Sequence, residues 1–575
     1  MDANRSINTE KTIDITKEIR NANIVMKPDR LGAMHQNRIS FVRSLTRKMA
    51  KEQWKVSQSE WQLSPQGYGH VIYKIMTPNH YYNLVIFCDQ IEDHERNDRV
   101  IAEKWDVTFA LVMGDVDINL LTQLQQNVPL QEAGRNPNNV LVLARANKSV
   151  RVFDHIIDQL ANGQQPKAEE LANVGYILRT TAVYGNGKFG IADFKLLEDN
   201  PDFNQSFSAQ MCAVYLLRLF SLDWVHYLAK QKGGNNAITL DRGLQRFLGV
   251  GNATGLGMAP YLINHPNIID QWMTTRERAV ATVLASSVTK EKAYALKVFI
   301  SKAKAHLTQT TTINAHQQQL NHSAVQELNQ LQAELIHTAL NASTWSDFIL
   351  ENNTLSLETQ EIILSCLLEI YPEKVDQFSD QMNSDEAYSL PRGKKVNELV
   401  TLIQSRYQWA IETDYTLPEN SYWFWYRSED KEEPRLGVRG EELGEERELP
   451  LDIGRQTSHL YQALVNAPQT QSIADFLLNQ PQYRTIVRRV WTLGNRVMGD
   501  IQSNVLHQNA LPMHLLRCKL ALFGATKFDP RSDRWVQVTF FQGAPLLDEI
   551  ELDDWLFPLL PSHLNQNNNN GELSL

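Results

Sequence analysis

The 575-residue chain has few cysteines and no long uninterrupted apolar run. Its four cysteines lie far apart and form no CxxC pair, which is typical of a protein in a reducing compartment. The most apolar stretch, residues 211–225, is interrupted by Arg218 and Asp223 and is shorter than the ~20 residues that a bilayer requires. The first residues contain no apolar core of a secretory signal. We therefore predict a cytoplasmic protein with no membrane partner.

Sequence motifs for metals, nucleotides and nucleophilic catalysis are also missing. The 15 histidines show no HExxH or HxxxH spacing, and neither GK[ST] nor GxSxG occurs. We therefore predict no metal site and name no cofactor. The net charge is −10 and there is no long basic block, so we do not expect nucleic acid as a partner.

The pattern of apolar residues predicts the fold class. Residues 71–76, 84–88 and 105–113 have the composition and alternation of strands, and residues 140–144 could add a fourth. Helical periodicity dominates after residue 163. We predict a mainly α protein with an N-terminal α+β portion, in which an antiparallel meander packs on helices and a large multi-helix domain follows.

Composition shifts along the chain suggest five segments. We expect a loosely ordered segment (1–30), an α+β domain with antiparallel strands (31–163), a helical domain with glycine-rich loops and a long helical hairpin (164–420), an aromatic and charged loop with helices and a C-terminal strand (421–562), and a disordered tail (563–575). The helices within residues 289–341 carry an apolar stripe and are the surface through which we would expect a homo-oligomer to form.

A glycine-rich stretch, RFLGVGNATGLGMAPYL at residues 246–262, is the first candidate site. We predict a turn here, because the preceding residues look helical and prolines follow, which argues against a dinucleotide-binding loop. One interpretation is a packing turn in which glycine permits close approach. The other is a ligand loop whose backbone amides bind a carboxylate or phosphate. In that case the substrate-binding residues are Asn252, Thr254, Gly255 and Gly257.

A second glycine-punctuated stretch covers residues 179–194. Arg179 and Lys188 are candidates to bind an anionic substrate, and Tyr184 is a candidate for proton transfer. The alternative is a hairpin turn with ordinary surface charges.

Residues 421–435, SYWFWYRSEDKEEPR, change abruptly from aromatic to charged. They form either a core strand that returns to a solvated loop or an aromatic-lined site. Burial beside aromatic rings raises the pKa of a carboxyl group, as a general acid or base near neutral pH requires. For the site, the substrate-binding candidates are Tyr422, Trp425, Arg427 and Arg435, and the catalytic candidates are Glu432 and Glu433.

Two functions from different classes remain open. The first is a cytosolic metabolic enzyme acting on a small carboxylate- or phosphate-bearing substrate by metal-independent acid/base chemistry. The second is a non-enzymatic helical interaction or scaffold protein, which the glutamine-rich residues 314–341 and the charged residues 427–448 favour. Convergence of the three candidate segments on one cavity would favour the enzyme, and separate positions would favour the scaffold.

Overall fold

The computed structural model describes residues 19–91, 104–128, 137–182, 197, 199–205, 207–255, 266–381, 389–417, 420, 423–427, 433–437, 449–450, 453–502, 514, 517–531 and 535–561. The structure is about 55% helix and 15% strand. No helix in these ranges is both long and apolar enough to cross a membrane.

Nine strands of the described chain form one mixed sheet, in the order β1-β2-β3-β4-β5-β6-β7-β12-β11. All neighbours are antiparallel except β6 and β7, which are parallel. The strands are β1 (Lys55–Leu63), β2 (Gly69–Met76), β3 (Tyr81–Cys88), β4 (Val107–Met113), β5 (Val140–Lys148), β6 (Tyr176–Thr180), β7 (Gly249–Gly255), β11 (Ala525–Pro530) and β12 (Trp535–Phe540).

This sheet corrects our prediction of the fold class. We predicted an antiparallel meander confined to an N-terminal α+β portion, with a separate multi-helix domain after it. The sheet is instead mixed, and β7, β12 and β11 from the later parts of the chain complete it. The physical reason is that glycine has a low strand propensity. The three glycines of β7 therefore predict a turn, and only the pairing with neighbouring strands identifies this stretch as a strand.

The helices fall into three groups. Beside the sheet are α3 (Phe41–Lys51), α4 (Ile118–Asn127), α5 (Phe153–Ala161), α6 (Ala168–Ala172), α8 (Ser208–Gly233), α9 (Arg242–Phe247) and α23 (Arg517–Phe523). The helical bundle consists of α11 (Pro266–Leu284), α12 (Lys290–Gln309), α13 (Ala315–Asn341), α14 (Trp345–Glu351), α15 (Leu357–Glu369) and α16 (Pro372–Val375). The small helical domain contains α17 (Val396–Arg406), α18 (Gln408–Glu412), α19 (Ile453–Val465), α20 (Ile473–Asn479) and α21 (Arg484–Thr492).

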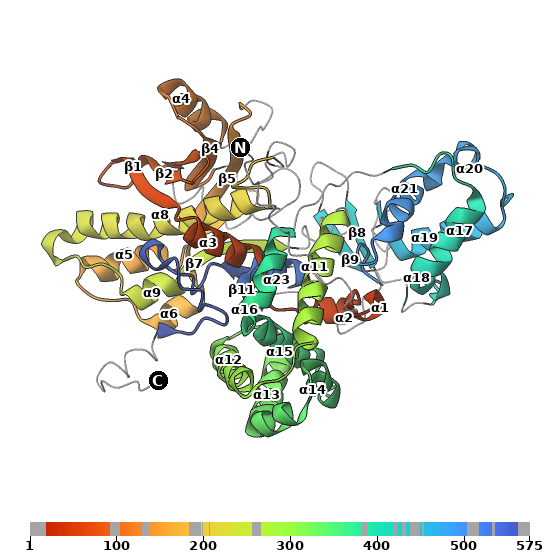
Figure 1. The fold of residues 1–575 in the computed structure, drawn as a ribbon. Coiled ribbons are helices and arrows are strands. Elements are labelled where there is room, and N and C mark those ends of the chain that lie inside the picture. Colours follow the sequence, from red (N-terminus) through yellow and green to blue (C-terminus); the bar gives the residue numbers. More distant parts are fainter. Residues whose placement is uncertain are drawn as a thin grey trace, which may run out of the picture.

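Figure 1 shows how these groups are arranged. The sheet and its helices occupy the left, α12–α15 lie at the bottom, and the small helical domain extends to the right. Short helices α1 (Ala22–Val25) and α2 (Pro28–Leu31) lie between the bundle and the small helical domain. A second sheet, β10-β8-β9, consists of β8 (Trp423–Arg427), β9 (Glu433–Gly437) and β10 (Leu449–Pro450).

Successive side chains along each strand point to opposite faces of the large sheet. On β2, Val71, Tyr73 and Ile75 belong to the main core, which also contains most of the buried side chains of α8. Ile72 points to the other face and shares a smaller core with Leu124 of α4. This period-two alternation is what a sheet covered on both faces requires.

Buried ion pairs join the N-terminal segment to the helical bundle. The Glu361 carboxylate of α15 lies 2.7 Å from Arg30 and 3.0 Å from Arg20. It also contacts Arg276 of α11, which lies 2.7 Å from Glu277. Both carboxylate side chains are 0% exposed. Burial alone would raise the pKa of the Glu361 carboxyl group, but the three arginines hold it well below its usual range.

A second set of ion pairs joins α3 to the bundle and to the C-terminal segment. The Arg43 side chain is 0% exposed and lies 2.5 Å from Glu369 and 2.7 Å from Asp553. Arg38 also lies 2.9 Å from Asp553. We call both sets together the buried arginine network. It connects residues near the two ends of the described chain.

The substitution Glu361→Gln tests this network. It leaves three arginines around a neutral group, and removing one partner of a buried ion pair typically destabilises a protein by about 3–5 kcal/mol. We expect a loss of that size in the free energy of unfolding, measured by urea denaturation at pH 7. The control is Glu334→Gln, at an exposed position on α13, with an expected change below about 0.5 kcal/mol. Equal stability of the two variants would contradict the stabilising role of Glu361.

Candidate functional site

A cavity of about 510 Å³ opens beside strand β6, and we call it the β6 cavity. Its wall combines the end of β5 and the turn leading to α5, the segment containing β6, the β11–β12 hairpin, and the connection between α12 and α13. The lining residues are Lys148, Ser149, Val150, Arg151, Val174, Tyr176, Arg179, Ile313, Arg531 and Gln537. Residues almost 400 positions apart therefore share one wall.

Four residues of the described lining are cationic and none of that lining is acidic. The cationic residues are Lys148, Arg151, Arg179 and Arg531. The Nη2 atom of Arg531 lies 2.7 Å from Asp529 and donates to Gln537 Oε1 at 2.9 Å. Its Nε atom is buried and has no partner in the described chain. Arg151 is exposed and makes no hydrogen bond or ion pair with any described residue. The wall therefore carries an excess of positive charge.

The core holds one of these cations in place. The Lys148 ammonium lies 4.8 Å from the ring centroid of Phe153 and 4.7 Å from that of Trp224, as in cation–π contacts. The backbone N–H of Lys148 donates to Asp106 Oδ2 at 3.0 Å. Lys148 is thus positioned by packed side chains, whereas Arg151 reaches solvent.

The glycines of β7 accommodate close neighbours. In the parallel pairing, Tyr176 lies opposite Gly249 and Arg179 opposite Gly251. A Cβ atom at Gly251 would lie 2.4 Å from Cε1 of Tyr176, and one at Gly249 would lie 2.2 Å from the carbonyl oxygen of Phe540. Only glycine fits at these two positions. We predicted a turn for Gly249–Gly257, and the part of it that the structure describes, Gly249–Gly255, is instead a strand paired with β6 on one side and β12 on the other.

Of the predicted site residues that the structure describes, only Arg179 lines the β6 cavity. Asn252 is buried in β7 with 1% of its surface exposed, and Thr254 and Gly255 follow in the same strand. The parallel pairing therefore brings Arg179 beside the strand that contains these three residues.

The aromatic and charged segment lies elsewhere. Trp425 and Arg427 are on β8, opposite Arg435 and Glu433 of β9. Figure 1 shows these strands between α11 and the small helical domain, away from β7. The described parts of the three predicted segments therefore do not converge. The other predicted site residues lie outside the described ranges: Tyr184, Lys188, Gly257, Tyr422 and Glu432.

Sequence reasoning missed most of the cationic wall. Lys148 ends strand β5 and Arg151 lies in the turn before α5, and charged residues are common at both kinds of position and carry no functional signal there. Arg531 lies in a hairpin whose neighbour, β7, comes from the middle of the chain. The local sequence contains no pattern that links these positions. Only the strand pairing could have identified them as one site.

The chemistry of the β6 cavity is that of anion binding. Guanidinium groups donate paired hydrogen bonds to carboxylate and phosphate oxygens. Val150, Val174 and Ile313 add an apolar surface to the wall. The described lining contains no carboxylate or imidazole that could transfer a proton. Within the same ranges, no group of three or more His, Cys, Asp or Glu residues could hold a metal ion.

Comparisons with known proteins give no relative for this chain. No family model matches it, and neither the curated proteins nor the solved structures yield a significant match.

The substitution Gly251→Ala tests the packing beside the cavity. The added methyl group overlaps the Tyr176 ring, and overpacking of this kind typically destabilises a protein by about 1–3 kcal/mol. The free energy of unfolding, measured by chemical denaturation, should fall by that amount. The matched control is Gly393→Ala, because a Cβ atom there meets nothing within 4 Å. If Gly251→Ala were as stable as its control, the close approach of Tyr176 would be wrong.

Proposed function

We propose that the protein binds a small anionic molecule with an apolar portion in the β6 cavity. The observation that carries the proposal is the gathering of four cations from three distant parts of the chain around a space with no acidic lining residue. Arg531 does face a carboxylate, that of Asp529, which is not among the residues that line the cavity. Several cations around one cavity without an acidic residue in its described lining are what an anionic ligand requires.

The size and walls of the cavity support a small ligand. Sites for small molecules usually have volumes of roughly 300–1,000 Å³ and combine apolar walls with a few placed polar groups. The β6 cavity, at about 510 Å³, falls within this range. The arginines would bind the anionic group, and the apolar side chains would cover the remainder of the ligand. Gln537 adds an amide that already bridges Arg531 and the carbonyl of Val174.

Catalysis by this site would require a proton-transferring group, and in the described lining only Tyr176 and Lys148 are of a suitable type. Tyr184 is the predicted catalytic residue closest to the site in sequence, five positions after Arg179. We therefore propose metal-independent acid/base chemistry as an extension of anion binding, with Tyr184 as its first candidate. Glu433 belongs to the separate β8–β9 pair.

Two exposed apolar side chains favour a second function, as a self-associating helical protein. Tyr294 and Val298 lie one helical turn apart on α12 and are 49% and 66% exposed. They fall within residues 289–341, where we predicted a surface for a homo-oligomer. Apolar side chains that neighbour each other on a helix face are typical of a surface that pairs with another helix.

Binding of phenyl phosphate tests the main proposal. This probe joins a phosphate to an apolar ring, so it should bind about tenfold more tightly than inorganic phosphate, and phenol should bind weakest. We expect Arg151→Ala and Arg179→Ala each to weaken phenyl phosphate binding by about tenfold, because each removes a charged donor. Isothermal titration calorimetry of the full chain measures all three ligands.

The control is Arg484→Ala, which removes an exposed arginine on α21, distant in sequence from the cavity. It should leave the affinity for phenyl phosphate unchanged. The proposal fails if wild type binds none of the three probes at millimolar concentration. It also fails if Arg151→Ala and Arg179→Ala both bind phenyl phosphate as wild type does.

Sedimentation velocity tests the second function. If α12 mediates self-association, Val298→Glu should reduce the dimer fraction, whereas Ile118→Glu, at a position 72% exposed on α4, should not. A wild-type chain that remains monomeric at a concentration of about 100 μM would exclude this role, because a dimer with a dissociation constant in the micromolar range would form there.

A further inference from the structure

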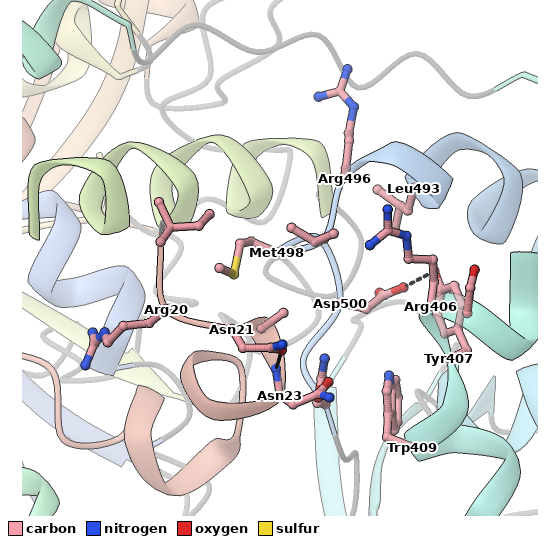
Figure 2. A pocket seen from close by; sticks show the side chains of 15 residues that line it. Arg20, Asn21, Asn23, Arg406, Tyr407, Trp409, Leu493, Arg496, Met498 and Asp500 are labelled. Atoms are coloured by element: carbon pink, nitrogen blue, oxygen red, sulfur yellow. Dashed lines mark hydrogen bonds between the residues drawn. The ribbon is translucent and has the colours of Figure 1, made fainter. Parts of the chain in front are cut away.

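A second cavity, of about 240 Å³, lies where the small helical domain meets the rest of the protein. We call it the domain cavity, and Figure 2 shows its lining side chains. Three segments form it: residues 19–23 before and within α1, residues 405–409 at the junction of α17 and α18, and residues 493–502 after α21. It is separate from the β6 cavity, with which it shares no lining residue.

Two charged groups of the domain cavity are already neutralised. Arg20 lies 2.7 Å from Glu277 and belongs to the buried arginine network. The Asp500 carboxylate accepts a hydrogen bond from Arg489 Nε at 2.8 Å and another from the Tyr407 hydroxyl at 2.6 Å. The negative charge of Asp500 is therefore already balanced by Arg489.

Two other arginines of this lining have no such partner. Arg406 is the last residue of α17, and Arg496 follows α21 by four positions. Neither guanidinium group makes a hydrogen bond or an ion pair with any residue that the structure describes, although the charge of Arg496 acts on the buried Asp270 carboxyl group. In Figure 2 the Arg406 side chain lies beside Leu493 and Asp500, and that of Arg496 extends outward from the same side of the cavity. The lining thus carries two guanidinium groups without an ion-pair partner among the described residues.

From these observations we infer that the domain cavity is a second anion-binding site, for a compact phosphate-class oxyanion held by Arg406 and Arg496. The volume is below the range of roughly 300–1,000 Å³ that is usual for larger ligands, so a group of the size of phosphate or diphosphate fits better than a whole metabolite. Asn21 and Asn23 on the opposite wall offer side-chain amides as further donors.

A ligand at this position would connect two parts of the protein. Arg406 belongs to the small helical domain, whose own apolar core contains Val396, Leu399 and Ile403 of the same helix. Ala22 and Met498, on the other side of the cavity, belong to the main core. The bound oxyanion therefore stabilises the contact between the small helical domain and the sheet region. This inference is independent of the function proposed for the β6 cavity.

Titration of the full chain with inorganic pyrophosphate tests the inference. We expect Arg406→Ala and Arg496→Ala each to weaken binding at this site by about tenfold, the effect of losing one charged hydrogen-bond donor. Arg392→Ala, which removes an exposed arginine of the same domain that does not line the cavity, should have no effect. Arg151→Ala should also leave this site intact, because Arg151 lines only the β6 cavity.

Hydrogen–deuterium exchange of the wild type locates the bound probe without any substitution. Pyrophosphate should slow exchange in residues 19–23, 403–409 and 493–502. The inference is overturned if wild type does not bind pyrophosphate at millimolar concentration, or if both arginine variants bind it unchanged. Slower exchange confined to residues 148–151 would also overturn it, because the probe would then occupy the β6 cavity alone.

Discussion

Buried charge is the constraint on which the rest of this structure depends. Arg43, Glu277 and Glu361 are fully removed from solvent, and an unpaired charge in such a position destabilises the fold by several kcal/mol. Each must therefore meet its partner when the chain folds. These partners come from the N-terminal segment with Arg20 and Arg30, from α11 and α15, and from the segment around Asp553. The pairing therefore brings the two ends of the described chain to the same helical bundle.

The large sheet contains the chain segment that precedes Asp553. The β11–β12 hairpin of this segment pairs with β7 and extends the sheet. That pairing places Arg531 near Arg179 and the end of β5. The protein thus uses arginine in two ways: paired with carboxylates inside the core, and gathered around the β6 cavity, whose described lining contains no carboxylate. The first use gives stability, and we propose that the second gives binding.

Local sequence predicts only part of this arrangement. Alternation such as that of Val107, Phe109 and Leu111 is enough to locate a strand like β4. The strand β7 could not be predicted from its own sequence, because its glycines are not typical of a strand. They are required there by close contacts with Tyr176 and Phe540, which belong to other segments. Arg179 could be chosen as an anion-binding candidate because it precedes a glycine-rich stretch. Arg151 and Arg531 could not, since ordinary surface arginines have the same local sequence features.

The central claim is that the β6 cavity binds an anion. Its most direct test is X-ray diffraction from crystals of the full chain soaked in sodium tungstate, whose anomalous scattering marks the position of a bound oxyanion. If the cavity binds an anion, a strong anomalous peak should lie within hydrogen-bonding reach of Arg151, Arg179 or Arg531. A map with no peak in the β6 cavity, in crystals where that cavity is open to solvent, would contradict anion binding there.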